Sequence, residues 1–214
     1  MSTAAIGLQH VTFGYTSEPV MDNLSFSIPS GQFTVITGEN GAAKTTALKL
    51  LGGLLVPWSG SRFGMRQSAV SYLPQDAAAI EPDFPSTVRE FVLSGVWDRK
   101  KWFQRIRKED KAKAAEMIGQ FGLSELADRP IGRLSGGQRQ KACTARAFMA
   151  APSILLLDEP TSGMDEKTRK QFYQVLKAMT PAVTIVMITH HLDELQPYLD
   201  RILQMEEGTC ICSN

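Results

Sequence analysis

Hydrophobic and polar residues alternate or cluster along the chain, and these patterns predict where the strands lie. LSFSI (24–28) alternates cleanly and LQHVTF (8–13) does so roughly, as in strands with one buried face. FTVIT (33–37) is a short β-branched run ending at a glycine, and it also predicts a strand. ILLL (154–157) and TIVMIT (184–189) are continuous apolar runs, typical of strands buried on both faces of a sheet.

Helical patterns follow two of these strands. Residues 44–51 predict a helix directly after the glycine-rich stretch that follows 33–37. Residues 166–178 have helical character between the last two buried strands. A strand–helix–strand crossover of this kind indicates a parallel sheet.

The middle of the chain has a different pattern, because residues 76–140 contain no convincing strand. One helix there has an apolar face made of Val88, Phe91 and Val92. A second helix is predicted at 108–121, with four residues directed inward: Ala114, Ala115, Ile118 and Phe121. We interpret 76–140 as a helical subdomain inserted into an α/β core formed by 1–75 and 141–214, within a single domain.

Composition narrows the function classes. The 214 residues are 43% hydrophobic and 21% charged, as in ordinary soluble proteins, and a net charge of +1 does not indicate nucleic acid as a partner. The apolar runs are too short to span a bilayer, and the N-terminus does not resemble a secretory signal. Three cysteines make no disulfide framework, which favours a reducing cytoplasm.

The stretch TGENGAAKTT (37–46) is a near match to a phosphate-binding loop, which reads Gly, four residues, Gly, Lys, Ser/Thr. Ala43 stands where the second glycine is expected. Such loops direct backbone N–H groups at an anion beside a helix N-terminus. The candidate nucleotide-binding residues are Gly38, Glu39, Asn40, Gly41, Ala42, Ala43, Lys44, Thr45 and Thr46.

Within this loop, Lys44 is expected to reach the outer phosphates and the Thr45 hydroxyl to hold Mg²⁺. The alternative is a glycine-rich turn with an exposed lysine, but the strand before the loop and the helix after it favour a nucleotide site. If Ala43 must adopt a left-handed conformation, alanine costs ~1–2 kcal/mol there. That penalty weakens a site without abolishing it, so we expect a nucleotide site with reduced affinity.

ILLLDEP places two carboxylates at the end of a buried strand, where ligands of α/β sheets bind. Asp158 is expected in the Mg²⁺ shell, and Glu159 is expected to orient and polarise a water for attack on the γ-phosphate. The alternative is an acidic pair that caps a turn. Beside a plausible phosphate loop, the catalytic interpretation is favoured.

LSGGQRQ (134–140) precedes a helical run and forms a second helix N-terminus suited to an anion. The candidate residues are Ser135, Gly136, Gly137 and Gln138. Taken alone, a plain helix cap is the simpler interpretation. Two anion sites in one small chain suggest instead that two copies share their nucleotides.

Together these motifs resemble the nucleotide-binding subunit of an ABC transporter, over nearly the whole chain. Residues 38–45 match the Walker A loop apart from Ala43, 154–159 match Walker B with its glutamate, and 134–138 match the LSGGQ signature. The resemblance implies further roles: Gln75 (in YLPQ) links Mg²⁺ and water to the helical subdomain, Asp165 (in SGMD) belongs to the D-loop, His190 is the switch histidine, and Tyr15 stacks on adenine.

The resemblance also implies the fold, the ligands and the partners. The fold is a P-loop NTPase core with a mainly parallel sheet, an antiparallel N-terminal β portion and an inserted helical subdomain. Since Glu159 and His190 are both of the active type, the resemblance implies a working ATPase that binds ATP and Mg²⁺, with Thr45, Gln75 and Asp158 around the metal. Two copies form an ATP-dependent, head-to-tail homodimer. A separate membrane-spanning permease and an extracytoplasmic solute-binding protein complete the system, with this chain on the cytoplasmic face of the membrane.

Three stretches resemble bacterial zinc and manganese importer ATPases: STVREFVLSG (86–95), DRPIGRLSGGQRQ (128–140) and YLDRILQM (198–205). Siderophore importers share much of this pattern. ATPases of other importers or exporters, and soluble ABC ATPases of repair, translation or cluster assembly, remain as alternatives. The latter usually carry long coiled coils or two cassettes, which this sequence does not show.

Two clusters have simpler explanations. The basic stretch from Arg99 to Lys113 includes Trp102 and Phe103, but we expect a solvated helical face there rather than a nucleic-acid site. Cys210 and Cys212 would share one face of a strand, and a metal site there is the weaker interpretation.

Overall fold

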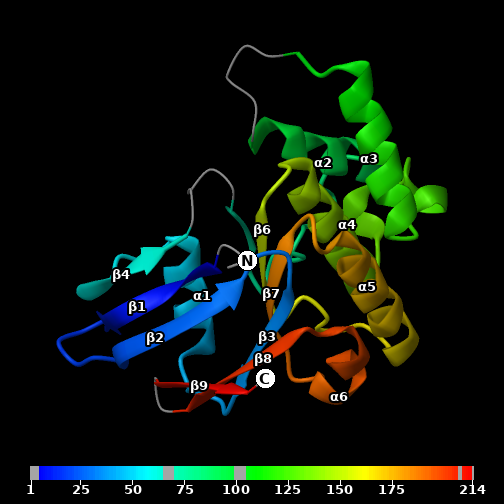
Figure 1. Cartoon of the computed structure of the whole chain (residues 1–214). Helices are drawn as coiled ribbons and strands as arrows, with labels where there is room; N and C mark the ends of the chain where they lie inside the picture. The colour runs from blue at the N-terminus through cyan, green and yellow to red at the C-terminus, as the bar shows by residue number, and fades with distance from the viewer. Residues whose placement is uncertain (1–4, 65–69, 99–104, 207–208, 214) are drawn as a thin grey trace.

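The computed structural model describes residues 5–64, 70–98, 105–206 and 209–213, and the strands form two sheets (Figure 1). The smaller sheet is antiparallel, in the order β2-β1-β4, and the larger sheet has the order β5-β6-β7-β3-β8-β9. The strands are β1 (Ala5–Phe13), β2 (Met21–Pro29), β3 (Phe33–Gly38), β4 (Ser59–Phe63), β5 (Val70–Leu73), β6 (Ile154–Asp158), β7 (Thr184–Ile188), β8 (Arg201–Glu206) and β9 (Thr209–Ser213).

Six α-helices lie in the described residues: α1 (Lys44–Gly52), α2 (Val88–Ser94), α3 (Lys108–Gln120), α4 (Gly136–Met149), α5 (Glu166–Met179) and α6 (Leu192–Leu195). Short 3₁₀ turns occur at Gly95–Asp98, Ser124–Leu126, Ile131–Arg133 and Gln196–Tyr198. In the ranges described, no helix has the length and apolar character needed to cross a membrane.

The larger sheet is parallel except for its edge strand β9, which runs antiparallel to β8. Neighbouring strands β6, β7 and β3 therefore end at the same edge. The predicted strands at 33–37, 154–157 and 184–189 are confirmed, with β3 and β6 on either side of β7. The carboxyl edge is where an α/β sheet binds its ligands.

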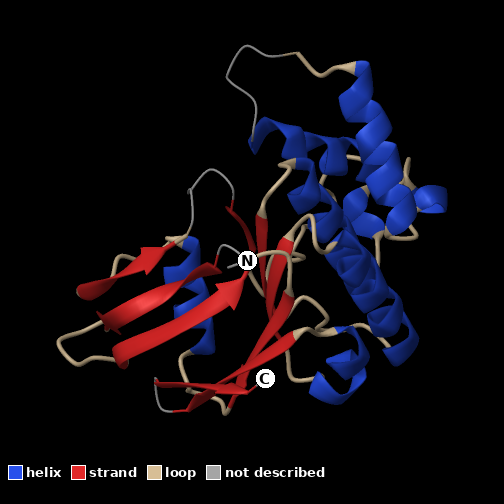
Figure 2. Cartoon of the chain, in the orientation of Figure 1, coloured by secondary structure: helices blue, strands red, loops and turns tan. Residues whose placement is uncertain are grey.

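Two hydrophobic layers cover the two faces of this sheet. Ile36, Leu156 and Val186 face α1, which lies between the large sheet and the antiparallel sheet (Figure 2). The alternate residues of the same strands face the other layer, which contains side chains of α2, α3, α4 and α5. Period-two alternation thus explains why each central strand is apolar on both faces.

The described part of 76–140 contains helices and turns, and its one β feature is an isolated bridge between Thr87 and Pro130. One inward residue of the predicted 108–121 helix was wrong: Ala115 is exposed, and Met117 is buried beside Ala114 and Ile118. One residue step rotates a helix by about 100°, which turns Ala115 away from the buried stripe.

Candidate nucleotide-binding site

The candidate phosphate loop joins β3 to the N-terminus of α1. Gly38 and Gly41 have φ angles of 146° and 90°, which side chains rarely adopt. The buried Lys44 ammonium donates to the carbonyl oxygens of Gly38 and Glu39 at 2.9 and 2.7 Å, so it spans the loop from inside. An open hollow of about 1150 Å³ borders residues 37–42, so this part of the loop is accessible to a ligand.

Ala43 occupies the position at which the motif expects glycine, and its backbone is left-handed, with φ 62° and ψ 25°. It is the N-cap residue of α1, and its carbonyl accepts the first helical hydrogen bond, from the N–H of Ala47 at 2.9 Å. A left-handed alanine is strained by ~1–2 kcal/mol. Of the two conformations that the sequence left open for Ala43, the structure has the strained one.

Ala43→Gly is therefore expected to raise the free energy of unfolding by roughly 1 kcal/mol, because relief of ~1–2 kcal/mol of strain exceeds ~0.4–1 kcal/mol of added chain entropy. It is also expected to tighten ATP binding, by at most about tenfold. Thermal unfolding and titration with a labelled ATP analogue measure the two effects. Ala42→Gly is the matched control and should stabilise nothing; an Ala43 variant with no gain in either measurement contradicts the prediction.

Asp158 ends β6 beside the loop. The Thr45 hydroxyl donates to Asp158 Oδ1 and the Tyr72 hydroxyl to Oδ2, both at 3.2 Å. Burial raises the pKa of Asp158, and these two hydrogen bonds oppose the increase. The Thr45 hydroxyl and the Asp158 carboxylate are hard oxygen ligands of the type Mg²⁺ prefers, so the residues fit the predicted metal.

Glu159 lies at the centre of the second cluster. Its backbone is also left-handed, with φ 47°, and its N–H donates to the Ile188 carbonyl at 3.0 Å. His190 Nε2 is 3.0 Å from Glu159 Oε1, and Gln75 Nε2 lies 3.5 Å from Oε2. The structure thus brings together the three residues predicted to be catalytic, and Gln75 faces Glu159 in this arrangement. A strained residue held by the sheet is typical of functional sites.

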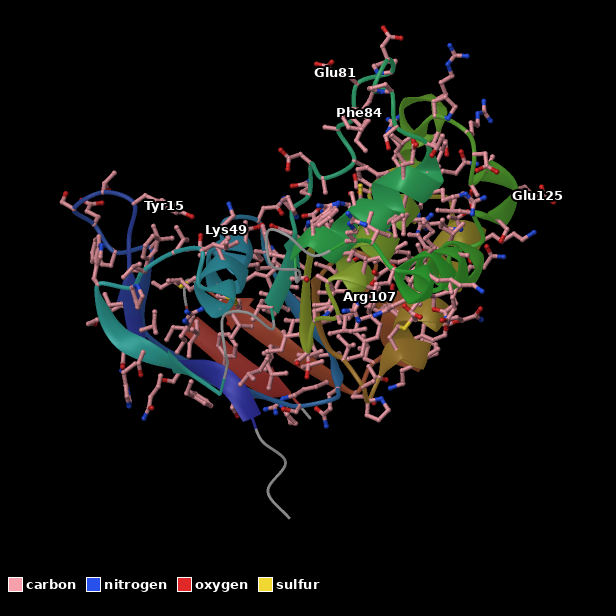
Figure 3. The ribbon with its side chains drawn as sticks, turned by 90° about the horizontal axis from the view of Figure 1, so that it is seen from above. Tyr15, Lys49, Glu81, Phe84, Arg107 and Glu125 are labelled. Atoms are coloured by element: carbon pink, nitrogen blue, oxygen red, sulfur yellow. The ribbon has the colours of Figure 1, made fainter. Side chains whose placement is uncertain are left out.

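Tyr15 is on the outer loop between β1 and β2, on the opposite side of the molecule from Glu125 (Figure 3). Tyr15 is 61% exposed, its ring packs against the Phe13 ring at an interplanar angle of 86°, and its hydroxyl lies 3.2 Å from the Thr46 hydroxyl at the start of α1. An exposed aromatic face next to the phosphate loop is suited to a flat base. Its stacking on adenine stays a prediction.

The signature segment begins α4. Ser135 Oγ accepts the N–H of Gln138 at 3.3 Å, and Gln138 Oε1 accepts the N–H of Ser135 at 3.0 Å, which forms a capping box. Gly136 is exposed, and a methyl group placed on Gly137 would lie 3.2 Å from Met164. The signature segment therefore packs closely against the segment that leads to Asp165.

Asp165 caps α5. Its carboxylate accepts the N–H of Thr168 at 2.8 Å, and the hydrogen bonds from Thr168 lower the pKa of Asp165. In the single chain, Ser135 and Asp165 each stabilise the start of their own helix.

Tyr72 was missed by the sequence interpretation, although it lies in the quoted YLPQ motif. It is on β5, paired with Leu156 of β6, so its hydroxyl reaches the carboxylate at the end of the neighbouring strand. Burial, followed by the Asp158 charge, raises the pKa of Tyr72, which keeps the hydroxyl a donor. Its position three residues before Gln75 could have indicated Tyr72, but only if β5 had been predicted as a strand.

The cysteines near the end of the chain and the basic stretch were the remaining candidates. Within the described ranges, no group of three or more His, Cys, Asp or Glu side chains is placed to hold a metal ion. Cys210 and Cys212 pair with Met205 and Leu203 across β8 and β9. Trp102 and Phe103 of the basic stretch lie outside the described residues.

Comparison with known proteins identifies the family. A family model described as ABC transporter matches residues 21–162. The high-affinity zinc uptake system ATP-binding protein of Bacillus subtilis (strain 168) is 38% identical over 211 residues, which are 95% of this chain and 91% of that protein. A zinc transport system ATP-binding protein of Streptococcus pneumoniae is also 38% identical, over 94% of this chain and 89% of its own.

Solved structures have the same fold. An ABC transporter in an inward-facing conformation matches with a TM-score of 0.85 and 26% identity, over 99% of this chain and 83% of that chain. A dimeric bacterial ABC transporter cassette matches with a TM-score of 0.80 and 25% identity, over 96% of each chain. The chain belongs to the ABC transporter family and is an ATPase subunit of it.

Proposed function

We propose that this chain hydrolyses ATP to power the import of a divalent metal ion, zinc or manganese, through a separate membrane-spanning permease. The observation that carries the hydrolytic part is the Glu159 carboxylate, held between His190 and Gln75 at the end of β6. The metal assignment is supported by relatives that are named for zinc transport and resemble this chain over more than nine tenths of its length.

In the proposed reaction a water attacks the γ-phosphorus in line, and the bond to the β–γ bridging oxygen breaks to leave ADP and phosphate. Glu159 orients the water and takes its proton, and His190 contacts the γ-phosphate. Lys44 and the loop N–H groups stabilise the phosphate charge. Bound Mg²⁺ would supply positive charge at the phosphate oxygens, with Thr45 and Asp158 as its protein ligands and Gln75 near its shell.

The active unit is proposed to be a head-to-tail dimer. In it Ser135, Gly136 and Gly137 of one copy approach the γ-phosphate bound by the other, and Asp165 contacts the opposite cassette. The exposed Ser135–Gly136 helix start supports this, because it offers an anion site to an approaching molecule. The relative that forms a dimeric cassette supports it as well.

Residues 76–140 are proposed to act as the helical subdomain that receives the permease, and 1–75 with 141–214 as the core that holds ATP. This arrangement places the chain at the cytoplasmic face of the membrane. An extracytoplasmic solute-binding protein is proposed to deliver the ion to the permease on the other side.

The test is transport by the complex of this chain with its permease in proteoliposomes. We expect ATP on the side of this chain to drive accumulation of ⁶⁵Zn²⁺ or ⁵⁴Mn²⁺, with a ferric siderophore unable to compete. Uptake of the siderophore in place of either ion contradicts the metal assignment. Phosphate release by a chain that captures no membrane protein contradicts the transport role.

A further inference from the structure

Helix α5 carries two side chains that connect the segment after Glu159 to the segment around His190. The first segment is 160–165, which ends at Asp165, and the second is 189–195, which includes α6. Figure 1 shows α5 beside α6 on one side of the large sheet, and the two helices are in contact. Neither side chain belongs to the motifs that the sequence indicated.

Arg169 makes the outer connection. Its Nε and Nη2 donate to the two carboxylate oxygens of Glu194 at 2.8 and 2.5 Å, and its Nη1 donates to the Met164 carbonyl at 2.6 Å. The two charged side chains are only 15% and 22% exposed. A forked, charge-assisted pair of this kind fixes both position and orientation. Arg169 thus holds the residue before Asp165 to the helix that follows His190.

Tyr173 makes the inner connection, one helical turn along the same face of α5. Its side chain is completely buried, and its hydroxyl lies 3.4 Å from the Thr161 hydroxyl. Burial raises the pKa of Tyr173, and hydrogen bonding to Thr161 and to Thr189, the residue directly before His190, opposes the increase. Thr161 and Thr189 are themselves 2% and 3% exposed. Satisfied buried polar networks of this kind rigidify the segments they join.

We propose that Arg169 and Tyr173 are positioning residues that hold the Asp165 segment and the His190 segment as one unit. Contact of the partner cassette with Asp165 is then transmitted through these two side chains to the position of His190 relative to Glu159, which affects kcat. The inference rests on the proposed function, in which Asp165 crosses the dimer interface. It adds the physical connection from that interface to the reacting phosphate.

Lys170 provides a matched control on the same helix. It forms an ion pair with Glu166 at 2.5 Å, but both residues lie on α5 and their side chains are 49% and 65% exposed. Lys170→Gln therefore removes a charged pair within α5 and leaves the Arg169 hydrogen bonds to Glu194 and Met164 in place. Tyr173→Phe keeps the ring and its packing and removes only the hydroxyl.

The experiment measures steady-state phosphate release, ATP affinity and melting temperature for Arg169→Gln, Tyr173→Phe and Lys170→Gln. We expect the first two to lower kcat by about tenfold, as for loss of one hydrogen bond to a charged or buried group. Affinity for a labelled ATP analogue, measured in the Glu159→Gln background, should change less than about twofold, because the phosphate loop is untouched. Lys170→Gln should match the wild type.

A double-mutant cycle with Asp165→Ala then tests the route. If Arg169 acts through Asp165, the double variant should be no slower than Asp165→Ala alone. The proposal would be overturned if the reductions in kcat of the two single variants multiplied in the double variant, or if Tyr173→Phe kept the wild-type kcat. It would also be overturned if a variant lost ATP affinity and melting temperature together. If Arg169→Gln does not fold, the kcat values of Tyr173→Phe and Glu194→Gln test the proposal in its place. A wild-type chain without hydrolysis would instead contradict the proposed function itself.

Discussion

Glu159→Gln is expected to bind ATP as the wild type does and to lower steady-state hydrolysis by about two to four orders of magnitude, the range for a general base. Glutamine keeps the length and shape of the side chain that lies 3.0 Å from His190 Nε2. It cannot take a proton from the attacking water. Substrate binding uses the Lys44 loop, which the substitution leaves intact, so the loss should fall on kcat and spare ATP affinity.

Phosphate release measures the loss, and titration with a labelled ATP analogue measures retained binding. Glu166→Gln, a substitution in an exposed acid at the start of α5, is the control and should hydrolyse ATP normally. The stalled variant should also sediment as a dimer with Mg²⁺ and ATP. Normal phosphate release would remove Glu159 from its proposed role, and a monomer under saturating ATP would contradict the dimer.

Phe84→Asp is expected to reduce coupled transport by about 30-fold or more while basal ATPase stays near the wild-type rate. The magnitude is that of a hot-spot residue worth about 2 kcal/mol. Phe84 lies on the segment between Gln75 and α2, at the edge of the molecule (Figure 3), and is 43% exposed. Val88 and Val92 are fully buried and Phe91 is half-buried, so Phe84 is the exposed large apolar side chain between Gln75 and the end of α2.

Transport in proteoliposomes and ATPase of the isolated chain measure the two effects separately. Val56→Asp is the matched control, because Val56 is an 82% exposed apolar residue on the loop between α1 and β4. It should change neither activity. Loss of both activities in Phe84→Asp would indicate a folding defect, and full transport would place the permease contact elsewhere.

The local patterns in the sequence were enough to predict the central strands and the loop that joins β3 to α1. Apolar runs identify a strand buried on both faces without knowledge of its neighbours. Strands β4, β5 and β8 were not predicted. β4 and β5 are short strands at sheet edges, and β8 (RILQME) mixes charged and apolar residues. Their strand character depends on pairing with segments far away in the chain.

The candidate site shows the same contrast between residues that local motifs identify and contacts that depend on the folded chain. Motifs placed Gln75, Glu159 and His190 near one another, since each follows a strand of the same parallel sheet. The Tyr72 contact with Asp158 and the Arg169 connection depend on three-dimensional register and on helix rotation, which no local pattern specifies. The sequence also could not predict the left-handed backbone of Ala43, because the loop and the start of α1 together determine that φ angle.

The capping box of Ser135 has a consequence for how quickly two cassettes can join. A hydroxyl offers one donor and two acceptor positions, and the cap uses one acceptor, for the N–H of Gln138. The O–H remains available to a phosphate while the cap is intact, and its oxygen is already fixed in space. The Ser135 side chain is therefore ordered during folding, and its conformational entropy is not lost again when two copies associate in the proposed dimer. In the proposed dimer, the Ser135 segment would therefore meet the nucleotide of the other copy as a surface already formed in the single chain.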